Sequence, residues 1–355
     1  VLGYTVEGFK EKDNGVEVLL KDNPSLQADM VVLAIGVTPD TALAKEAGLE
    51  LGIKGSIVVN DRMETSVPDI YAAGDAVQVK HYVTGDDALI SLAGPANKQG
   101  RIIADNICGG DSRYLGSQGS SVIKVFDITA ATTGINETNA KKSGLELDTV
   151  ILSPMSHAGY YPGGKVMTMK VVFEKDTYRL LGAQIIGYEG VDKRIDVLAT
   201  AIHAGLKATQ LKDLDLAYAP PYSSAKDPVN MAGFMIDNIA KGTLKQWHLE
   251  DMDKISRDKS VVLLDVRTVG EFNRGHMDGF KNIPVDELRE RINEIEKGKP
   301  VYLICQSGLR SYIASRILEG NGYETYNFSG GFRFYDAVVN DRALIEKAYA
   351  CGMDY

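Results

Sequence analysis

Apolar and polar positions follow three different patterns along the chain, and the first pattern covers roughly its first third. Val16, Val18 and Leu20 alternate with polar residues, as in a half-exposed strand. The run 30–36 is continuously apolar, the pattern of a strand buried on both faces of a parallel sheet. Shorter strands are predicted at 57–59 and 70–72, and helices at 40–49 and 95–108. Because a domain rarely begins on such a strand pair, we expect a further portion of chain upstream of Val1.

The second pattern is rich in strands first and in helices afterwards. Strands are predicted at 121–128, 165–174 and 179–187, and the last two form a hairpin across Lys175 and Asp176. Helices are predicted at 192–204 and 229–240, on either side of an irregular segment rich in proline and tyrosine. Strands and helices in separate blocks are typical of an α+β domain.

In the third pattern, from His248 onward, strands and helices alternate. The predicted strands are 261–266, 301–305 and 325–328, and the predicted helices are 286–297, 311–322 and 330–339. Alternation with short connections favours a small parallel sheet with helices on both faces. The stretch 242–251 is the expected linker before this region.

Composition narrows the class of protein. Hydrophobic residues make up 44% and charged residues 25%, which is ordinary for globular domains. A net charge of −9 gives no basic surface for nucleic acid, and no apolar run approaches the roughly 20 residues of a membrane span. Three cysteines, Cys108, Cys305 and Cys351, form no disulfide framework, so we expect a reducing, cytoplasmic location. No metal-ligand spacing is present, and no metal site is expected.

Cys305 combines several features of a reactive cysteine. It ends an apolar strand, precedes a helix, and opens the loop Cys305-Gln306-Ser307-Gly308-Leu309-Arg310. The N–H groups of the turn, the positive end of the helix dipole and the Arg310 cation all favour a thiolate and an anion above it. We therefore predict Cys305 and Arg310 as catalytic residues and the four residues between them as the substrate-binding loop. The alternative is a cysteine that is merely packed at a strand end.

The region around this loop resembles the rhodanese family. The motifs before the loop are Asp265-Val266-Arg267, Glu271-Phe272, Gly275-His276-Met277 and Asn282-Ile283-Pro284, and Ser329-Gly330-Gly331-Phe332 follows it. The resemblance implies that Cys305 carries sulfane sulfur as a persulfide. Four residues separate Cys305 from Arg310, as in sulfurtransferases, whereas related phosphatases use a loop one residue longer. Asp265 and Arg267 also have a purely structural reading, a salt bridge that fixes a loop.

The first region resembles the pyridine nucleotide-disulfide oxidoreductases. In Ile70-Tyr71-Ala72-Ala73-Gly74-Asp75, a glycine allows close backbone approach to a ligand and an aspartate can accept from a sugar hydroxyl. This stretch resembles the family's second FAD-binding motif. Ala34-Ile35-Gly36 with Pro39 and Asp40 resembles the crossing from the NAD to the FAD domain, and Leu92-Ala93-Gly94-Pro95-Ala96-Asn97 resembles the helix that faces the flavin. The resemblance implies FAD binding by Gly36, Pro39, Asp40, Gly74, Asp75, Ala93, Gly94 and Ala96.

Two features of that family have no counterpart in this sequence. There is no Gly-x-Gly-x-x-Gly turn, and no cysteine stands at the position of the family's redox cysteine. Cys108 does not match that position, and we expect it to be a packing residue. The sequence therefore predicts that the missing elements lie upstream or in another chain, and that this chain alone does not hold FAD or NAD(P)H.

Residues 118–240 resemble the dimerisation domain of the same oxidoreductases. The pattern is most similar to CoA-disulfide reductases and NADH-dependent persulfide reductases, some of which carry a fused rhodanese domain. The resemblance implies a homodimer in which two tyrosines reach the partner's active cysteine. The candidates are Tyr160 or Tyr161 and Tyr218 or Tyr222. We favour Tyr160 and Tyr218 as catalytic and assign Tyr161, Tyr222 and Lys226 to substrate binding; the alternative is that the tyrosines support a turn or a dimer contact.

The predicted architecture is α/β and α+β multidomain. A partial FAD/NAD(P)-binding α/β domain comprises an NAD(P)-domain remnant (1–38) and the C-terminal part of an FAD domain (39–117). An α+β dimerisation domain (118–242) and a rhodanese-like α/β domain with a parallel sheet (248–355) follow.

The resemblance implies a flavin-dependent NAD(P)H:CoA-disulfide, persulfide or polysulfide reductase that uses FAD, NAD(P)H and coenzyme A. Its substrate would be a small disulfide or persulfide, with no nucleic acid or membrane partner. The alternatives are an NADH oxidase or peroxidase with an accessory rhodanese, and a catalytically incomplete dimeric sulfur-carrier scaffold.

Overall fold

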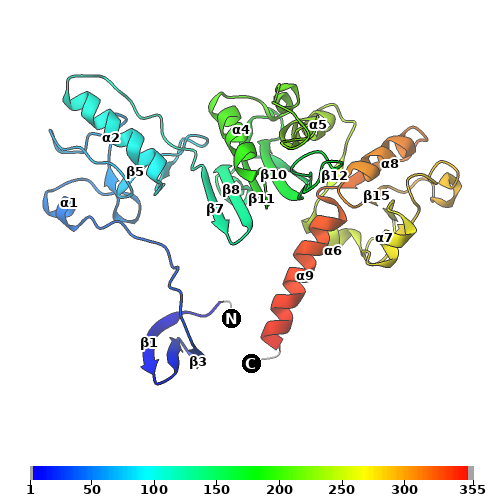
Figure 1. Ribbon diagram of the computed structural model, residues 1–355, viewed down its shortest axis with the longest axis horizontal. Helices are drawn as coiled ribbons and strands as arrows, with labels where there is room; N and C mark the ends of the chain where they lie inside the picture. Colours follow the sequence, from blue (N-terminus) through cyan, green and yellow to red (C-terminus); the bar gives the residue numbers. More distant parts are fainter. Residues whose placement is uncertain (1–2, 351–355) are drawn as a thin grey trace.

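The computed structural model describes the backbone of residues 3–350 and the side chains of residues 3–340, so Cys351 lies outside the described residues. Within this part, four sheets follow one another along the chain (Figure 1). The multidomain α/β and α+β class predicted from the sequence is confirmed.

The first sheet is a small antiparallel one, β1 (Val6–Lys12), β2 (Gly15–Leu20) and β3 (Asn23–Ala28). The predicted strand at 30–36 is absent. Most of its apolar side chains are exposed, from 66% for Leu33 to 86% for Ile35, and Val31 is half-buried. A parallel strand is stabilised by hydrogen bonds from its neighbours, and among residues 3–350 no strand pairs with this segment. The prediction of a buried strand is therefore wrong for this structure.

The next part contains a second small sheet and two helices. Its strands are β4 (Ile57–Val58), β5 (Val77–Lys80) and β6 (Asp87–Ala88). The helices α1 (Ala42–Glu46) and α2 (Ala93–Ile107) confirm two predictions, and a 3₁₀ turn covers Ile53–Gly55. The predicted strand at 70–72 is reduced to an isolated bridge between Tyr71 and Glu64. Cys108 caps α2 and is exposed, so the prediction that it packs in a core is wrong.

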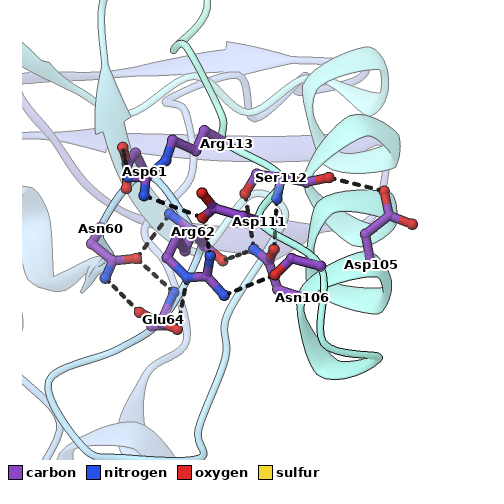
Figure 2. Close-up of polar contacts among 10 residues, drawn as sticks. Asn60, Asp61, Arg62, Glu64, Asp105, Asn106, Asp111, Ser112 and Arg113 are labelled. Atoms are coloured by element: carbon purple, nitrogen blue, oxygen red, sulfur yellow. Dashed lines mark hydrogen bonds and ion pairs between the residues drawn. The ribbon is translucent and has the colours of Figure 1, made fainter.

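A buried asparagine anchors the C-terminal end of α2 (Figure 2). The Nδ2 of Asn106 donates to the carbonyl oxygens of Arg62 (3.0 Å) and Ser112 (2.9 Å), and its Oδ1 accepts from the Ser112 N–H (2.8 Å). Arg62 also pairs with Glu64 and Asp111. Because α2 is a continuous helix, this network also fixes where its N-terminal end lies.

The third sheet is antiparallel, with strand order β7-β8-β11-β10-β9. Its strands are β7 (Ser121–Val125), β8 (Ile128–Gly134), β9 (Leu147–Leu152), β10 (Met167–Glu174) and β11 (Leu180–Gly187). The predicted β10–β11 hairpin is confirmed, whereas β9 was not predicted. The helices are α3 (Glu137–Lys142), α4 (Val191–His203) and α5 (Pro228–Ala240), with a 3₁₀ turn at Ala208–Asp213. Val171, Leu181 and Leu198 are among the fully buried core residues between helices and sheet.

The fourth sheet is entirely parallel, as predicted, with strand order β12-β16-β15-β13-β14. Its strands are β12 (Gln246–Trp247), β13 (Val262–Asp265), β14 (Lys281–Asn282), β15 (Val301–Ile304) and β16 (Thr325–Phe328). The helices are α6 (Met252–Ile255), α7 (Val269–Asn273), α8 (Leu309–Glu319) and α9 (Gly331–Ala350), with 3₁₀ turns at Leu249–Asp251 and Ile292–Glu294. In Figure 1, α9 projects away from this sheet.

Two predictions for this region are wrong. The expected linker 242–251 contains β12, and Trp247 is only 2% exposed because it packs into the core of the fourth sheet. The expected helix 286–297 is a series of turns with one 3₁₀ turn. The Tyr323 hydroxyl lies 3.3 Å from the Ile292 carbonyl oxygen and 3.1 Å from that of Ile295, so this segment is also held by a tertiary contact.

The fourth sheet docks onto β9, the edge strand of the third. Gln246 Nε2 donates to the Thr149 carbonyl (2.8 Å), and His248 Nε2 lies 3.1 Å from the Asp148 carboxylate. The Ile151 N–H donates to Ser329 Oγ (3.1 Å). These side chains cover an edge that would otherwise leave unpaired backbone groups.

Candidate functional site

Cys305 follows β15 directly and is 1% exposed. Its Sγ accepts hydrogen bonds from the Gly308 N–H (3.1 Å) and the Ser311 hydroxyl (3.2 Å). Gly308 is the N-cap of α8 and has a φ of +99°, a conformation that favours glycine. Both donors stabilise negative charge on sulfur, so the geometry suits a nucleophilic thiolate. Sequence reasoning missed Ser311, although its place one residue after Arg310, in the first turn of the helix, could have indicated it.

The carbonyl groups at the start of the loop are held from outside. The Phe332 N–H donates to the Cys305 carbonyl (2.8 Å), and the Arg333 N–H donates to the Gln306 carbonyl (3.2 Å). In a trans peptide the following N–H points the opposite way. The N–H groups of Gln306 and Ser307 therefore point away from α9, and no acceptor for them is found within residues 3–350. Free N–H groups arranged in this way can bind an anion.

Arg310 makes an ion pair with Glu271 rather than a hydrogen bond to Cys305. Two bonds of 2.7 Å join its guanidinium to both carboxylate oxygens. The hydrogen bonds from Arg310, aided by those from Thr268, lower the pKa of Glu271 to about 2. From the sequence, Glu271 was identified only as a residue of the Glu271-Phe272 motif. The spacing Thr268-x-x-Glu271, a capping box at the start of α7, could have predicted its fixed position.

Asp265 and Arg267 form a buried salt bridge, in agreement with their structural reading. The Arg267 Nη2 lies 2.7 Å from Asp265 Oδ2, and both side chains are almost fully buried. The guanidinium carbon of Arg267 also lies 3.8 Å from the ring centroid of Phe332. Since the Phe332 N–H donates to the Cys305 carbonyl, the Asp265–Arg267 salt bridge supports the Cys305 loop through Phe332.

The two tyrosines favoured from the sequence lie together. The hydroxyl groups of Tyr160 and Tyr218 are 2.7 Å apart, and the side chains are exposed. The hydrogen bond that Tyr218 shares with Tyr160, together with desolvation, raises the pKa of Tyr218, so its hydroxyl keeps its proton and can donate it. Tyr161 instead packs edge-on against the His157 ring, with centroids 5.6 Å apart.

A buried arginine holds the loops that carry these tyrosines. Arg194 in α4 is 1% exposed. It donates to the Ser156 carbonyl (2.9 Å), the Ser223 hydroxyl (3.1 Å) and the Asp227 carboxylate (3.0 Å). Ser156 precedes Tyr160 in one loop and Ser223 follows Tyr218 in the other. Sequence reasoning missed Arg194; a charged residue on the apolar face of α4, between Val191 and Leu198, was the available signal.

A cavity of about 530 Å³ lies beside this arginine. Tyr218 and Tyr222 contribute to its wall, together with Arg194. Tyr160, Tyr161 and Lys226 are not among its lining residues, and Lys226 is exposed. The structure thus groups two of the predicted substrate and catalytic tyrosines around one cavity; the other lining residues are Ser156, His157, Glu189, Gly190, Lys193, Ala217, Ala219 and Pro221.

The candidate flavin residues after β4 form one group. The Gly74 N–H donates to Gln99 Oε1 in α2 (2.7 Å), and Ser91, just before α2, approaches the Asp75 carbonyl (3.5 Å). Gly74 has a φ of +88°, and an added Cβ would meet no atom within 4 Å. The Asp75 carboxylate is exposed and has no hydrogen-bond partner in the described residues. Ala93, Gly94 and Ala96 form the first turn of α2, whose N-cap offers no side-chain acceptor.

This arrangement fits a ligand that carries hydroxyl and anionic groups. The Asp75 carboxylate is a free acceptor for hydroxyls, and the uncapped start of a 15-residue helix favours negative charge. By contrast, no hydrogen bond joins residues 36–40 to Gly74 or Asp75 in the described part of the chain. Gly36 and Pro39 lie in the exposed segment before α1, and Asp40 Oδ1 accepts only from the Ala42 N–H (3.5 Å).

No helix among residues 3–350 has both the length and the apolarity required to cross a membrane. Among residues 3–340, whose side chains the structure describes, no group of three or more His, Cys, Asp or Glu side chains is placed to hold a metal ion.

Three protein-family models match the chain in succession. Pyridine nucleotide-disulphide oxidoreductase matches residues 1–100, the dimerisation domain of the same family matches 120–228, and the rhodanese-like domain matches 248–337. The NAD(P)H sulfur oxidoreductase (CoA-dependent) of Pyrococcus abyssi is 38% identical over 219 residues, which are 62% of this chain and 49% of that protein. The chain therefore spans about half the length of the curated relatives it matches.

Two solved structures match nearly the whole chain. Reduced CoADR-RHD of Bacillus anthracis has a TM-score of 0.91 and 47% identity, covering 96% of this chain and 60% of that one. The NAD-dependent persulfide reductase of A. fulgidus has a TM-score of 0.84 and 40% identity, covering 94% of this chain and 61% of that one. Both matches cover more than nine-tenths of this chain, so each spans parts of all three regions matched by the family models.

Proposed function

Because the chain belongs to the pyridine nucleotide-disulphide oxidoreductases and carries a rhodanese-like domain, we propose that it serves an NAD(P)H-dependent reductase of CoA disulfide, CoA persulfide or polysulfide. Two similarities support this substrate class. The Pyrococcus relative is named a CoA-dependent sulfur oxidoreductase, and the A. fulgidus structure is a persulfide reductase. The dimerisation domain favours a homodimer.

The Cys305 loop carries the proposal of sulfur transfer. The Cys305 thiolate attacks the outer sulfur of thiosulfate, a Cys305 S–S bond forms, and the S–S bond of thiosulfate breaks as sulfite leaves with the electron pair. An acceptor thiolate or cyanide then takes the outer sulfur and restores the Cys305 thiolate. The single observation that supports this is the pair of donors on Cys305 Sγ, from Gly308 and Ser311, beneath free loop N–H groups.

The tyrosine loops supply a second site for sulfur chemistry. The paired hydroxyls of Tyr160 and Tyr218 can donate a hydrogen bond to a sulfur anion that forms when a disulfide or persulfide is reduced. Tyr161, Tyr222 and Lys226 are proposed to contact the substrate, of which coenzyme A is the expected carrier. Lys226 would meet its phosphate groups as an exposed cation.

FAD, when bound, would supply the transfer of the two electrons of NAD(P)H. Gly74, Asp75 and the first turn of α2 (Ala93, Gly94 and Ala96) would hold its sugar-alcohol chain and ring, as the exposed carboxylate and uncapped helix start suggest. Gly36, Pro39 and Asp40 are proposed to complete this site. The part of this chain that matches the relatives supporting these cofactors covers about half of their length.

The sulfur-transfer proposal is tested by treating the protein with thiosulfate and measuring intact mass. We expect a gain of one sulfur atom that cyanide removes as thiocyanate. Cys305→Ser should abolish both reactions, whereas Cys108→Ser, which changes an exposed cysteine elsewhere, should leave them unchanged. Persulfide formation in Cys305→Ser would refute Cys305 as the carrier.

The reductase proposal is tested by NADH consumption of the protein supplied with FAD. Turnover with CoA persulfide or CoA disulfide, lost in Tyr218→Phe, would support it. Turnover with oxygen and not with the sulfur substrates would instead identify an oxidase. A colourless protein without NADH turnover that still forms the Cys305 persulfide would identify a sulfur-carrier scaffold.

A further inference from the structure

Asn327 is a buried polar residue that the chemistry above does not explain. It lies in β16, in register with Leu303 of β15, and is 4% exposed. Its Nδ2 donates to the Gly308 carbonyl (3.1 Å), but its Oδ1 is buried and has no partner in the described part of the chain. A buried acceptor without a partner opposes folding. For stability alone, an apolar side chain of similar size would serve better at this position.

The Gly308 carbonyl belongs to the peptide that joins the loop to α8. It accepts from Asn327 Nδ2 (3.1 Å) and from the Tyr312 N–H (3.0 Å). The Ser311 hydroxyl also lies 3.1 Å away, but its single proton is needed for the hydrogen bond to a Cys305 thiolate. Because C=O and N–H point in opposite directions across a trans peptide, these donors turn the Leu309 N–H away from β16. No acceptor for that N–H is found among residues 3–350.

The carbonyls of the first two loop residues are held by backbone donors. Those of Cys305 and Gln306 receive N–H groups from the first turn of α9. Of the two donors to the Gly308 carbonyl, Tyr312 belongs to α8 itself and moves with it, whereas Asn327 belongs to the sheet. Asn327 is therefore the contact that fixes this peptide relative to the strand that precedes Cys305.

We propose that Asn327 is a positioning residue for sulfur transfer, which directs the Leu309 N–H at the anionic sulfur bound above Cys305. The inference rests on the proposed sulfurtransferase function of this loop. As sulfite leaves with its electron pair, the outer sulfur stays in the loop as the anionic end of the Cys305 persulfide, and a donor fixed beforehand stabilises that charge without reorganising.

Asn327→Leu separates positioning from stability. It removes the donor and the unpartnered oxygen together, so we expect thermal stability equal to or above wild type and a kcat/KM for thiosulfate that falls about tenfold, the scale of one hydrogen bond to a charged group. Asn321→Leu is the matched control, because its Nδ2 also donates to a backbone carbonyl, that of Ile317 (2.8 Å), at the far end of α8. A folded Asn327→Leu protein with wild-type kcat/KM would overturn the proposal.

Asn327→Asp gives a second readout that keeps the original shape. A neutral carboxyl can donate to the Gly308 carbonyl, whereas a carboxylate cannot, so its deficit relative to wild type should grow as pH rises. A deficit that does not change with pH would overturn the proposal. If the wild-type protein itself forms no persulfide, the proposed function fails; if wild type is active and both variants match it at every pH, only the role of Asn327 fails.

Discussion

The sharpest stability prediction compares two neighbouring cations that face the same carboxylate. Arg194 is 1% exposed and lies 3.0 Å from Asp227 Oδ2, while Lys193 is 38% exposed and lies 3.9 Å from the same oxygen. Arg194→Met leaves a buried aspartate without its main counter-ion. Lys193→Met removes only a solvated partner. The two substitutions therefore differ mainly in burial.

Removing one partner of a buried ion pair costs about 3–5 kcal/mol, and an exposed pair contributes about 0–1 kcal/mol. Asp227 keeps bonds from the Ser223 hydroxyl (2.7 Å) and the Val229 N–H (3.0 Å) after Arg194→Met, so we expect the lower end, about 3 kcal/mol. That corresponds to a loss of amide protection of roughly a hundredfold.

The measurement is hydrogen exchange of the slowest amides in β10 and β11, which report on unfolding of the third sheet. Lys193→Met is the control and should change their protection less than tenfold, in line with about 1 kcal/mol at most. Equal protection in the two variants would refute the argument that burial of the Arg194–Asp227 pair determines its contribution. Loss of protection confined to α4 would also contradict it, because Arg194 connects α4 to the loops before and after the β10–β11 hairpin.

Three further predictions concern the Cys305 domain. Glu271→Gln should lower thermal stability above pH 4.5 but not near pH 2. Pairing with Arg310 lowers the pKa of Glu271 from 4.5 to about 2, so the stabilisation from this pair disappears as pH falls through that range. A stability difference between variant and wild type that persists at pH 2 would contradict this. Ser311→Ala removes one donor from Cys305 Sγ and should slow the transfer of sulfur from thiosulfate to cyanide by roughly tenfold or more. Ser315→Ala is the control and should not slow it, because the Ser315 hydroxyl donates to the Tyr312 carbonyl on the same helix. Equal rates in the two variants would count against the role of Ser311. Ser329→Ala should leave the Ile151 N–H unpaired at a cost of about 1–3 kcal/mol and speed its exchange, and unchanged exchange would show that the docking contact is not stabilising.

Elements with strong local periodicity could be predicted from the sequence. The apolar face of α4 and the alternating β10 and β11 carry their pattern within a few residues, and the structure confirms them. The Cys305 loop was likewise visible because strand, glycine and arginine occur in one short stretch. The local pattern gave a wrong prediction where a segment needs neighbouring strands to form its structure. The run 30–36 has the composition of a central strand, but no strand in the described chain pairs with it.

Two of the missed residues share a physical reason. Arg194 and Asn327 act through contacts with residues that no short window of sequence contains. Asn327 contacts Gly308 across 19 positions and Arg194 contacts Asp227 across 33. Such contacts arise only once the sheets and helices are packed, so composition and spacing indicate a polar residue but not its partner.

Trp247 gives the chain an intrinsic spectroscopic reporter. It is the single tryptophan in the sequence, and its indole lies 2% exposed among Phe280, Tyr302 and Phe328. Its neighbours Gln246 and His248 contact β9 directly. Tryptophan fluorescence therefore reports on the interface between the third and fourth sheets without any attached dye. Separation of the two domains and unfolding of the sulfur-transfer domain can each be followed as a change in the emission of this one residue.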